Sequence, residues 1–191
     1  MNSNELIVSI EVAPENIEEY LNLSDEERNK KLNPIDSKII LIATKIKSNN
    51  EIKIFRGNEK EIISNFWKYV EDQKVNKFIG FNIKNFDFPF ITTRSFINNI
   101  KIAPFTLNKI IDLRELINAF RYGYTRGRLR EFADILQINL ADPEFEATQI
   151  PQLYYDNKFE ELEIFITNNI KILEELYNRA EILNFTKISR F

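Results

Sequence analysis

The chain has 191 residues, of which 43% are hydrophobic and 13% aromatic, enough to bury one core, so a single domain over residues 1–191 is expected. It contains no cysteine and no histidine, which excludes disulfides, thiolate or imidazole metal ligands, cysteine nucleophiles and histidine bases. The net charge of −3 gives no whole-molecule attraction to nucleic acid, so such binding requires a local basic surface. No apolar run is long enough for a membrane span or a signal peptide, and we expect a cytoplasmic protein with no membrane partner.

The first part of the chain predicts three strands that pair in antiparallel fashion. They are β-branched segments bounded by polar turns, at residues 6–12, 37–47 and 50–56. The two-residue side-chain period of the first strand places Ser9 and Glu11 on one face and Leu6, Val8 and Ile10 on the other. The charged segment over about residues 15–34 is expected to be a loop that contains one short helix, with a capping-box pattern at Ser24.

From residue 58 onward, apolar residues recur every three or four positions, which is typical of helices, and short buried strands separate them. Helices are predicted at about residues 58–70, 89–99, 113–120, 128–136 and 158–183, and strands at 77–81 and 109–112. The complete pattern predicts an α/β fold with a mixed five-stranded sheet flanked by helices, in which the first three strands are antiparallel.

Three short patterns occur at the ends of these elements. The first strand carries Ser-x-Glu at residues 9–11, and a strand-to-helix turn carries Asn-x-x-x-Phe-Asp-x-Pro-Phe at residues 82–90. The last helix carries Phe-x-x-x-Asn at residues 165–169, a spacing that places both side chains on one helix face. In order and separation these patterns resemble the motifs of the DEDD superfamily of 3′–5′ exonucleases, and in particular the proofreading exonuclease domain of family B DNA polymerases.

This resemblance implies a ribonuclease-H-like fold in which four acids coordinate two divalent cations and a helix tyrosine acts like a base. Of the four acids, only Glu11 and Asp87 remain in this chain. Ser9 and Asn169 stand where the family has aspartates, and Phe165 stands where it has the tyrosine. The candidate site is therefore degenerate.

The missing charges matter because two dications about 4 Å apart repel by roughly 17 kcal/mol at an effective dielectric of about 20. Four carboxylates balance two dications, whereas Glu11 and Asp87 balance one. Phe165 cannot relay a proton, and the loss of a general base typically costs about 10² to 10⁴ in rate. We therefore expect no catalytic residue, no cofactor or weakly bound Mg²⁺ or Mn²⁺ at Glu11 and Asp87, and an inactive or strongly impaired exonuclease homologue.

A second candidate site is the segment at residues 121–130, which has four arginines, two tyrosines and no acid. This composition suits phosphate contacts and base stacking, and it equally suits a solvated loop. The expected nucleic-acid-binding residues are Asn82, Phe86, Arg121, Tyr122, Tyr124, Arg126, Arg128 and Arg130. The expected partners are single-stranded DNA or RNA and a polymerase, helicase or other nucleic-acid-processing protein, with the chain as a binding or accessory subunit in DNA replication, DNA repair or RNA processing.

Two other interpretations remain open. An active exonuclease with a rewired site would need a replacement ligand, for which the candidates are Asp112, Asp142, Glu144 and Asp156. Alternatively, the chain is a protein-interaction module that has lost nucleic-acid binding. Ordinary structural roles also exist for the key residues, since Asp87 and Asp112 can cap helices and Phe165 can pack in the core. The changes at 165 and 169 would also suit deliberate inactivation, whereas serine at position 9 favours natural loss.

Overall fold

The computed structural model describes residues 4–118, 127–141 and 147–188. The five strands of this part of the chain form one sheet in the order β3-β2-β1-β4-β5. The strands are β1 (Glu5–Pro14), β2 (Ser37–Ile46), β3 (Ile52–Phe55), β4 (Lys77–Gly80) and β5 (Ile110–Asp112). β1, β2 and β3 pair in antiparallel fashion, whereas β4 runs parallel to β1 and β5 parallel to β4. The mixed five-stranded sheet predicted from the sequence is confirmed.

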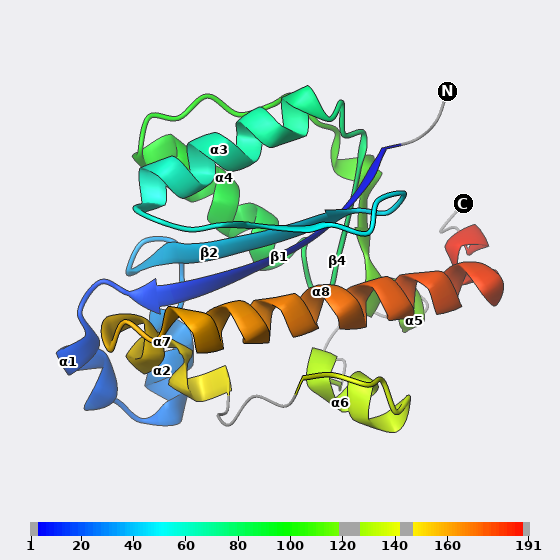
Figure 1. Ribbon diagram of the computed structural model, residues 1–191. Coiled ribbons are helices and arrows are strands. Elements are labelled where there is room, and N and C mark those ends of the chain that lie inside the picture. The colour runs from blue at the N-terminus through cyan, green and yellow to red at the C-terminus, as the bar shows by residue number, and fades with distance from the viewer. Residues whose placement is uncertain (1–3, 119–126, 142–146, 189–191) are drawn as a thin grey trace.

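Helices cover both faces of this sheet (Figure 1). One face carries α3 (Glu59–Asp72) and α4 (Asp87–Ile97), and the other carries α5 (Leu113–Ile117), α6 (Leu129–Ile135), α7 (Ile150–Tyr155) and α8 (Phe159–Ile182). Between β1 and β2 lie α1 (Ile17–Leu21) and α2 (Asp25–Lys31), and single 3₁₀ turns occupy Leu107–Lys109, Ala147–Gln149 and Phe185–Lys187. No helix in the described ranges is long and apolar enough to cross a membrane.

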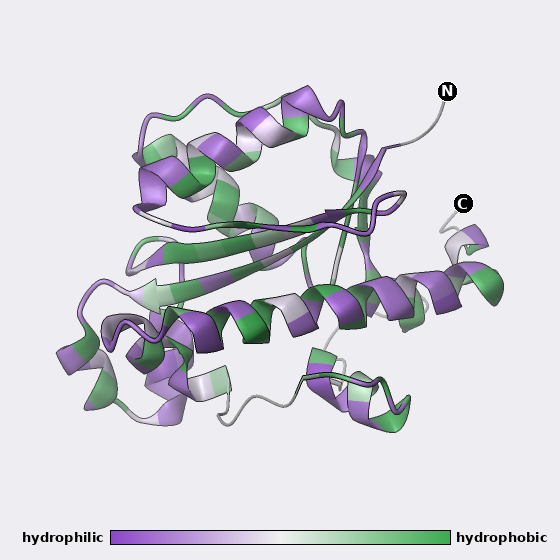
Figure 2. Ribbon diagram, viewed as in Figure 1, coloured by the Kyte–Doolittle hydropathy of each residue, from purple (hydrophilic) through white to green (hydrophobic). Residues whose placement is uncertain are grey.

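β1 is almost completely buried because helices cover both of its faces. Alternate residues from Leu6 to Val12 pack with α3 and α4, whereas Ile7 packs on the α8 side of the sheet. Since side chains alternate along a strand, Ser9 and Glu11 share the face of Ile7 and point towards α8. Figure 2 shows how hydrophobic the central strands are, with the polar residues gathered on the outer helix faces.

β2 contains a bulge opposite the second half of β1. Glu11 pairs with Leu41 and Val12 pairs with Ile39, so Ile40 is an extra residue that has no partner on β1. Ile40 and Leu41 both belong to the core cluster on the α8 side. The bulge therefore places two consecutive aliphatic side chains on the face of the sheet that Glu11 also uses.

The structure corrects three expectations about local structure. The predicted loop over residues 15–34 contains two helices, because the side chain of Asn16 accepts a hydrogen bond from the Glu19 amide at 3.1 Å and starts α1 ahead of α2. α7 was not predicted at all. Both α1 and α7 are too short to show a helical period in the sequence. β5 begins at Ile110 because the preceding residues form a 3₁₀ turn.

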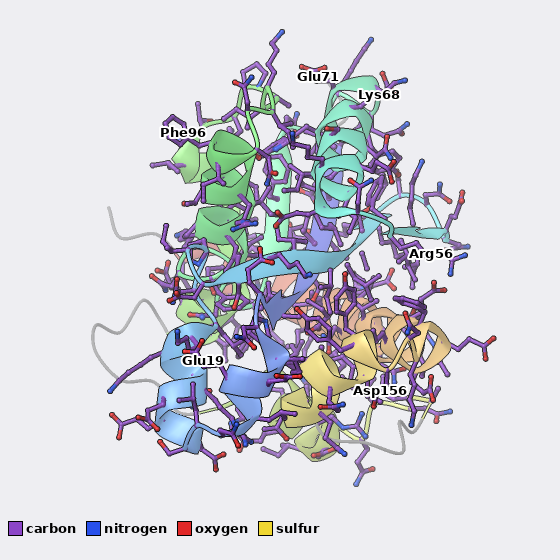
Figure 3. All side chains as sticks on the ribbon, turned by 90° about the vertical axis from the view of Figure 1, so that its left-hand side faces the viewer. Glu19, Arg56, Lys68, Glu71, Phe96 and Asp156 are labelled. Atoms are coloured by element: carbon purple, nitrogen blue, oxygen red, sulfur yellow. The ribbon has the colours of Figure 1, made fainter. Side chains whose placement is uncertain are left out.

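The face of the sheet under α3 and α4 has an aromatic core. Phe66 and Trp67 of α3 lie with their ring centroids 5.0 Å apart, and Phe66 also meets Phe55 of β3 edge-on at 6.2 Å. Phe66 is completely buried. In contrast, Phe96 at the end of α4 is 88% exposed and lies at the surface of the molecule (Figure 3). These two phenylalanines offer a direct test of the layer arrangement.

Phe66→Ala should lower the free energy of unfolding by about 3–5 kcal/mol, because it removes a buried ring and leaves a cavity. Phe96→Ala is the matched control on the neighbouring helix and should change the free energy of unfolding by no more than about 0.5 kcal/mol. Chemical denaturation followed by circular dichroism measures both values. Similar losses for the two variants would contradict the burial described for α3 and α4.

Candidate functional site

The first part of the site is the carboxyl end of β1. β4 pairs with β1 only from Glu5 to Ile7, after which the chain leaves the sheet and turns into α4. Further along β1, the backbone amide of Ile10 donates a hydrogen bond to Oδ1 of Asp87 at 3.2 Å, where a sheet partner would otherwise bind. Asp87 is the first residue of α4 and is only 7% exposed. The strand edge therefore holds this carboxylate beside Glu11.

The second part of the site comes from α8. Nδ2 of Asn169 donates a hydrogen bond to Oε1 of Glu11 at 3.0 Å. Phe165, one turn earlier, is partly buried and packs against the core cluster on that side of the sheet. Ser9 is buried on the same strand face as Glu11. The structure thus joins Glu11, Asp87 and Asn169 from three separate elements, and Ser9 and Phe165 occupy adjoining positions on two of them.

Burial controls the ionisation of both carboxylates. Burial and the nearby charge of Asp87 raise the pKa of Glu11 to about 8, although the hydrogen bond from Asn169 opposes this shift. Burial also raises the pKa of Asp87 to about 7, against the effect of hydrogen bonds from the amides of Asp87 and Ile10, and the charge of Asp112 adds to the rise. Near neutral pH the two groups therefore keep part of their protons, and the site holds less than two negative charges.

Asp112 has a structural role at the end of β5. Oδ1 accepts hydrogen bonds from the amides of Asn82 at 2.9 Å and Arg114 at 3.0 Å, and Oδ2 accepts one from the Lys84 amide at 3.2 Å. It is the N-cap of α5, and burial raises its pKa. These bonds hold the β4–α4 turn, in which Asn82 has a left-handed backbone with φ of 58°.

The other proposed replacement ligands do not complete a metal centre. Asp156 is an exposed residue at the end of α7 (Figure 3), and its Oδ1 accepts a hydrogen bond from Nε2 of Gln152 at 2.8 Å. Asp142 and Glu144 lie outside the described residues. Within the described ranges, no three acidic side chains come close enough together to hold a metal ion. The residues present therefore do not fit the pair of dications for which the resembled family uses four acids.

The structure places four of the eight expected nucleic-acid-binding residues. Phe86 is partly buried in the turn that also contains Asn82. Its ring centroid lies 5.0 Å from that of Phe90. Arg128 and Arg130 are exposed at the start of α6. α6 is anchored near the end of β4, because the rings of Phe132 and Phe81 lie 5.6 Å apart. The other four residues, Arg121, Tyr122, Tyr124 and Arg126, lie outside the described residues.

Sequence reasoning missed two side chains that support the site. The hydroxyl of Tyr155 on α7 donates to the carbonyl of Pro14 at 2.6 Å, which fixes the end of β1. Asn168 on α8 is 2% exposed and donates a short hydrogen bond from Nδ2 to the carbonyl of Ala141. Asn168 is two residues from both Ile166 and Ile170 and therefore out of phase with the apolar stripe, so no sequence pattern predicted its burial. Tyr155 gave no sequence signal, because its partners are backbone atoms distant in the chain.

Comparisons with known proteins agree with this geometry. The family described as "DNA polymerase family B, exonuclease domain" matches residues 5–138. An uncharacterised protein of Methanocaldococcus jannaschii is 33% identical over 132 residues, which cover 68% of this chain and 73% of that protein. The family B DNA polymerase of the hyperthermophilic archaeon Pyrobaculum calidifontis has a similar structure, with a TM-score of 0.72 over 94% of this chain at 13% identity.

The chain spans 25% of the length of that polymerase, so the likeness concerns one part of a larger protein. At this low identity the structural likeness shows the fold, which is the ribonuclease-H-like fold expected from the three motifs. The match of the family over residues 5–138 covers all five strands and the first two motifs. The chain therefore belongs to the exonuclease-domain family of family B DNA polymerases.

Proposed function

We propose that this chain is a nucleic-acid-binding domain that keeps the exonuclease fold and has lost most or all of its hydrolytic activity. The observation that carries the proposal is the composition of the cluster at the end of β1. Glu11 and Asp87 meet there with raised pKa values, and Asn169 completes the cluster with an amide in place of a carboxylate. With so little negative charge, the cluster cannot offset the mutual repulsion of a pair of dications.

A single divalent cation is the most that these residues support. Glu11, Asp87 and the amide oxygen of Asn169 would hold one Mg²⁺ or Mn²⁺, which prefer oxygen ligands. The amide would first have to turn, since its nitrogen faces Glu11. The carboxyl groups would also have to release their protons, so binding would be weak and would strengthen as the pH rises.

The rewired exonuclease is less well supported. Asp112 is close enough to Asp87 to raise its pKa, which makes it the natural candidate for a third acidic ligand. However, both of its oxygens already accept hydrogen bonds from backbone amides of the β4–α4 turn and of α5. Recruiting Asp112 to a metal would take these partly buried amides away from their acceptor, at a cost of up to about 1–3 kcal/mol for each group that is left unpaired.

The expected ligand is a single strand of DNA or RNA, consistent with family membership. The turn that contains Asn82 and Phe86 borders the carboxylate cluster. Arg128 and Arg130 are exposed at the start of α6, where Arg130 also pairs with Asp134 at 3.5 Å. The proposed role is an accessory one beside a polymerase, helicase or other nucleic-acid-processing protein in replication, repair or RNA processing, in keeping with a family described by its place in DNA polymerases. The absence of nucleic-acid binding would favour a protein-interaction module.

The primary test is digestion of end-labelled single-stranded DNA and RNA with Mg²⁺ or Mn²⁺, with binding measured in the same samples. We expect binding without 3′–5′ cleavage. The triple variant Ser9→Asp/Phe165→Tyr/Asn169→Asp should gain cleavage, because it restores both missing acids and the tyrosine. Its control is the same triple variant with Glu11→Ala, which should again be inactive. Cleavage by the unmodified protein that Glu11→Ala or Asp87→Ala abolishes would instead establish a rewired nuclease.

A pH titration in EDTA tests the ionisation of the cluster. Unfolding returns Glu11 and Asp87 to ordinary pKa values near 4.5 and 3.8, so the folded chain binds more protons above those values. Their contribution to stability is therefore complete below about pH 4 and is lost as the pH rises through about 7 to 8. Glu11→Gln removes the titrating group, so the difference between its free energy of unfolding and that of the unmodified protein should grow in favour of the variant by about 3–4 kcal/mol from pH 5 to pH 8.

The control for this titration is Glu18→Gln, which removes an exposed acid of α1 and should follow the unmodified protein across the range. Urea denaturation at each pH gives the free energies of unfolding. A pH-independent difference between Glu11→Gln and the unmodified protein would show that Glu11 titrates normally and that the cluster does not retain protons near neutral pH.

The arginines of α6 can be tested by the salt dependence of binding. Arg128→Ala/Arg130→Ala should weaken binding of single-stranded nucleic acid and reduce the slope of log affinity against log salt by about 0.7 for each phosphate that the variant no longer neutralises. The charge-matched control is Lys60→Ala/Lys68→Ala, which removes two exposed lysines of α3, a helix on the opposite side of the sheet from α6 (Figure 1). An equal loss in both double variants would mean that only net charge matters.

A further inference from the structure

A hollow of about 300 Å³ lies between α4 and the connection that leads into β5, on the face of the sheet that α3 and α4 cover. Most of its lining is apolar and includes Phe88, Thr92, Phe105 and Leu107. The charged lining residue, Lys84, forms an ion pair with Glu115 at 2.7 Å, so this pair is close to neutral. Glu11 and Asn169 meet on the opposite face of the sheet, so the hollow opens on the side away from them.

Large apolar side chains gather at the surface around this hollow. Of the twelve large hydrophobic residues that are exposed in the described part of the chain, four lie between residues 96 and 107. Phe96 follows Thr92 by one turn of α4 and is 88% exposed, so it extends this side of the helix past the hollow (Figure 3). Leu107 is 75% exposed and forms part of the lining. A single exposed hydrophobic residue needs no explanation, whereas a group of them beside a hollow is typical of an interaction site.

The charge of this surface is opposite in sign to that of the whole chain. Residues 88–111 contain no acid, although the chain has a net charge of −3. Lys101 and Lys109 are exposed in this segment, and neither forms an ion pair within the part of the chain that the structure describes. The third basic residue, Arg94, is buried and paired with Glu59, so it does not add to the charge of the surface. We name the following set the α4 surface: the hollow together with Phe96, Lys101, Leu107 and Lys109.

We propose that the α4 surface binds an acidic segment of a partner protein, with one large apolar side chain of that segment seated in the hollow. The charges indicate the class of partner, because unpaired lysines beside an acid-free apolar patch attract an acidic ligand and repel a basic one. Ligand pockets span roughly 300–1,000 Å³, so a hollow of about 300 Å³ suits a side chain rather than a whole cofactor. An apolar centre with a charged rim is also the usual composition of a protein–protein interface.

A nucleic-acid strand fits the α4 surface less well. The affinity of a strand depends on several basic side chains that neutralise its phosphates, whereas this surface has two unpaired lysines and no exposed arginine. The inference does not rest on the proposed nucleic-acid binding, because Glu11 and Asn169 lie on the other face of the sheet and both faces can be occupied at once. It gives an accessory domain a surface for its partner.

The chemistry of the ligand is tested by selection from a phage-displayed library of random peptides of about twelve residues, with the unmodified protein as the target. The enriched peptides should carry several Asp or Glu residues around one or two large apolar residues. The most strongly enriched peptide without Trp is then synthesised with a fluorescein label. This peptide is the probe for affinity measurements by fluorescence polarisation.

Leu107→Asp places a charge in the lining and should lower the affinity for this peptide at least about 10-fold, as expected for a central apolar contact. Ile135→Asp is the matched control and should leave the affinity unchanged. Ile135 is 76% exposed and lies on α6, on the opposite side of the sheet (Figure 1). Thermal melting shows that both variants are folded.

Lys101→Glu/Lys109→Glu should lower the affinity at least about 5-fold at low salt and by less at high salt, because the two reversed charges are exposed and are screened by ions. The charge-matched control is Lys158→Glu/Lys171→Glu, which reverses two exposed lysines at α8 and should have little effect. Equal losses in the two double variants would mean that only the net charge matters, and would contradict the α4 surface as the binding site.

Trp67 reports whether the hollow is occupied. It is the only tryptophan of the chain, and its ring stacks on Phe105 with centroids 6.0 Å apart and planes at 12°. A side chain that enters the hollow contacts Phe105 and changes the surroundings of the indole. At the peptide concentration that half-saturates the unmodified protein, the emission of Trp67 should change in that protein and in Ile135→Asp, and hardly at all in Leu107→Asp.

Four other outcomes would overturn the inference. The first two are that no peptide is enriched and that the enriched peptides are basic. The third is that Leu107→Asp weakens the binding of single-stranded nucleic acid and not that of the peptide, which would make the α4 surface a nucleic-acid contact. The fourth is that the unmodified protein self-associates in analytical ultracentrifugation and Leu107→Asp does not, which would make the occupant a second copy of this chain. A failure of the proposed function is seen separately, as the absence of nucleic-acid binding by the unmodified protein.

Discussion

The hydrogen bond from the Ile10 amide to the Asp87 carboxylate joins the two halves of the site. It exists because β4 stops pairing with β1 at Ile7, so the next part of the strand edge has amides that need another acceptor. A helix that begins with an acid meets this need, and its position fixes the β4–α4 turn, the start of α4 and the surroundings of Glu11. The carboxylate is therefore part of the fold as well as of the site, so Asp87 has a structural role that does not depend on catalysis.

Much of the fold follows from local patterns in the sequence. The long last helix has enough residues for its three- to four-residue apolar spacing to be recognised in the sequence, and the five strands are recognised by their β-branched, apolar residues. α1 and α7 were missed because five or six residues form barely one helical turn and a half, and their positions depend on tertiary contacts. The bulge at Ile40 was not predicted, because residues 39–43 around it are all apolar and no polar residue there marks the change of phase.

The sequence patterns predicted which residues meet in the candidate site, but they did not predict the pKa values of those residues. Motif order brought Glu11, Asp87 and Asn169 together, and the structure places them as neighbours. The raised pKa values of the two acids depend on burial that no spacing reveals. The role of Asp112 was undecided in the sequence, where a cap and a ligand look the same. In this structure Asp112 is the cap, because its three shortest hydrogen bonds all come from backbone amides.

The bulge in β2 affects how readily such a site can be regained once it decays. Leu41 is the cross-strand partner of Glu11, and Ile40 lies on the same face of the sheet. Burial among such side chains makes the charge of Glu11 costly whenever no cation is present. If one acid of such a site is lost and cation binding weakens, each remaining buried charge is a cost to the folded state, and replacing another acid by an amide removes that cost. Regaining the site requires several acids to return together, since a single restored carboxylate adds buried charge before it can bind a cation. A site of this kind is therefore lost more easily than it is regained.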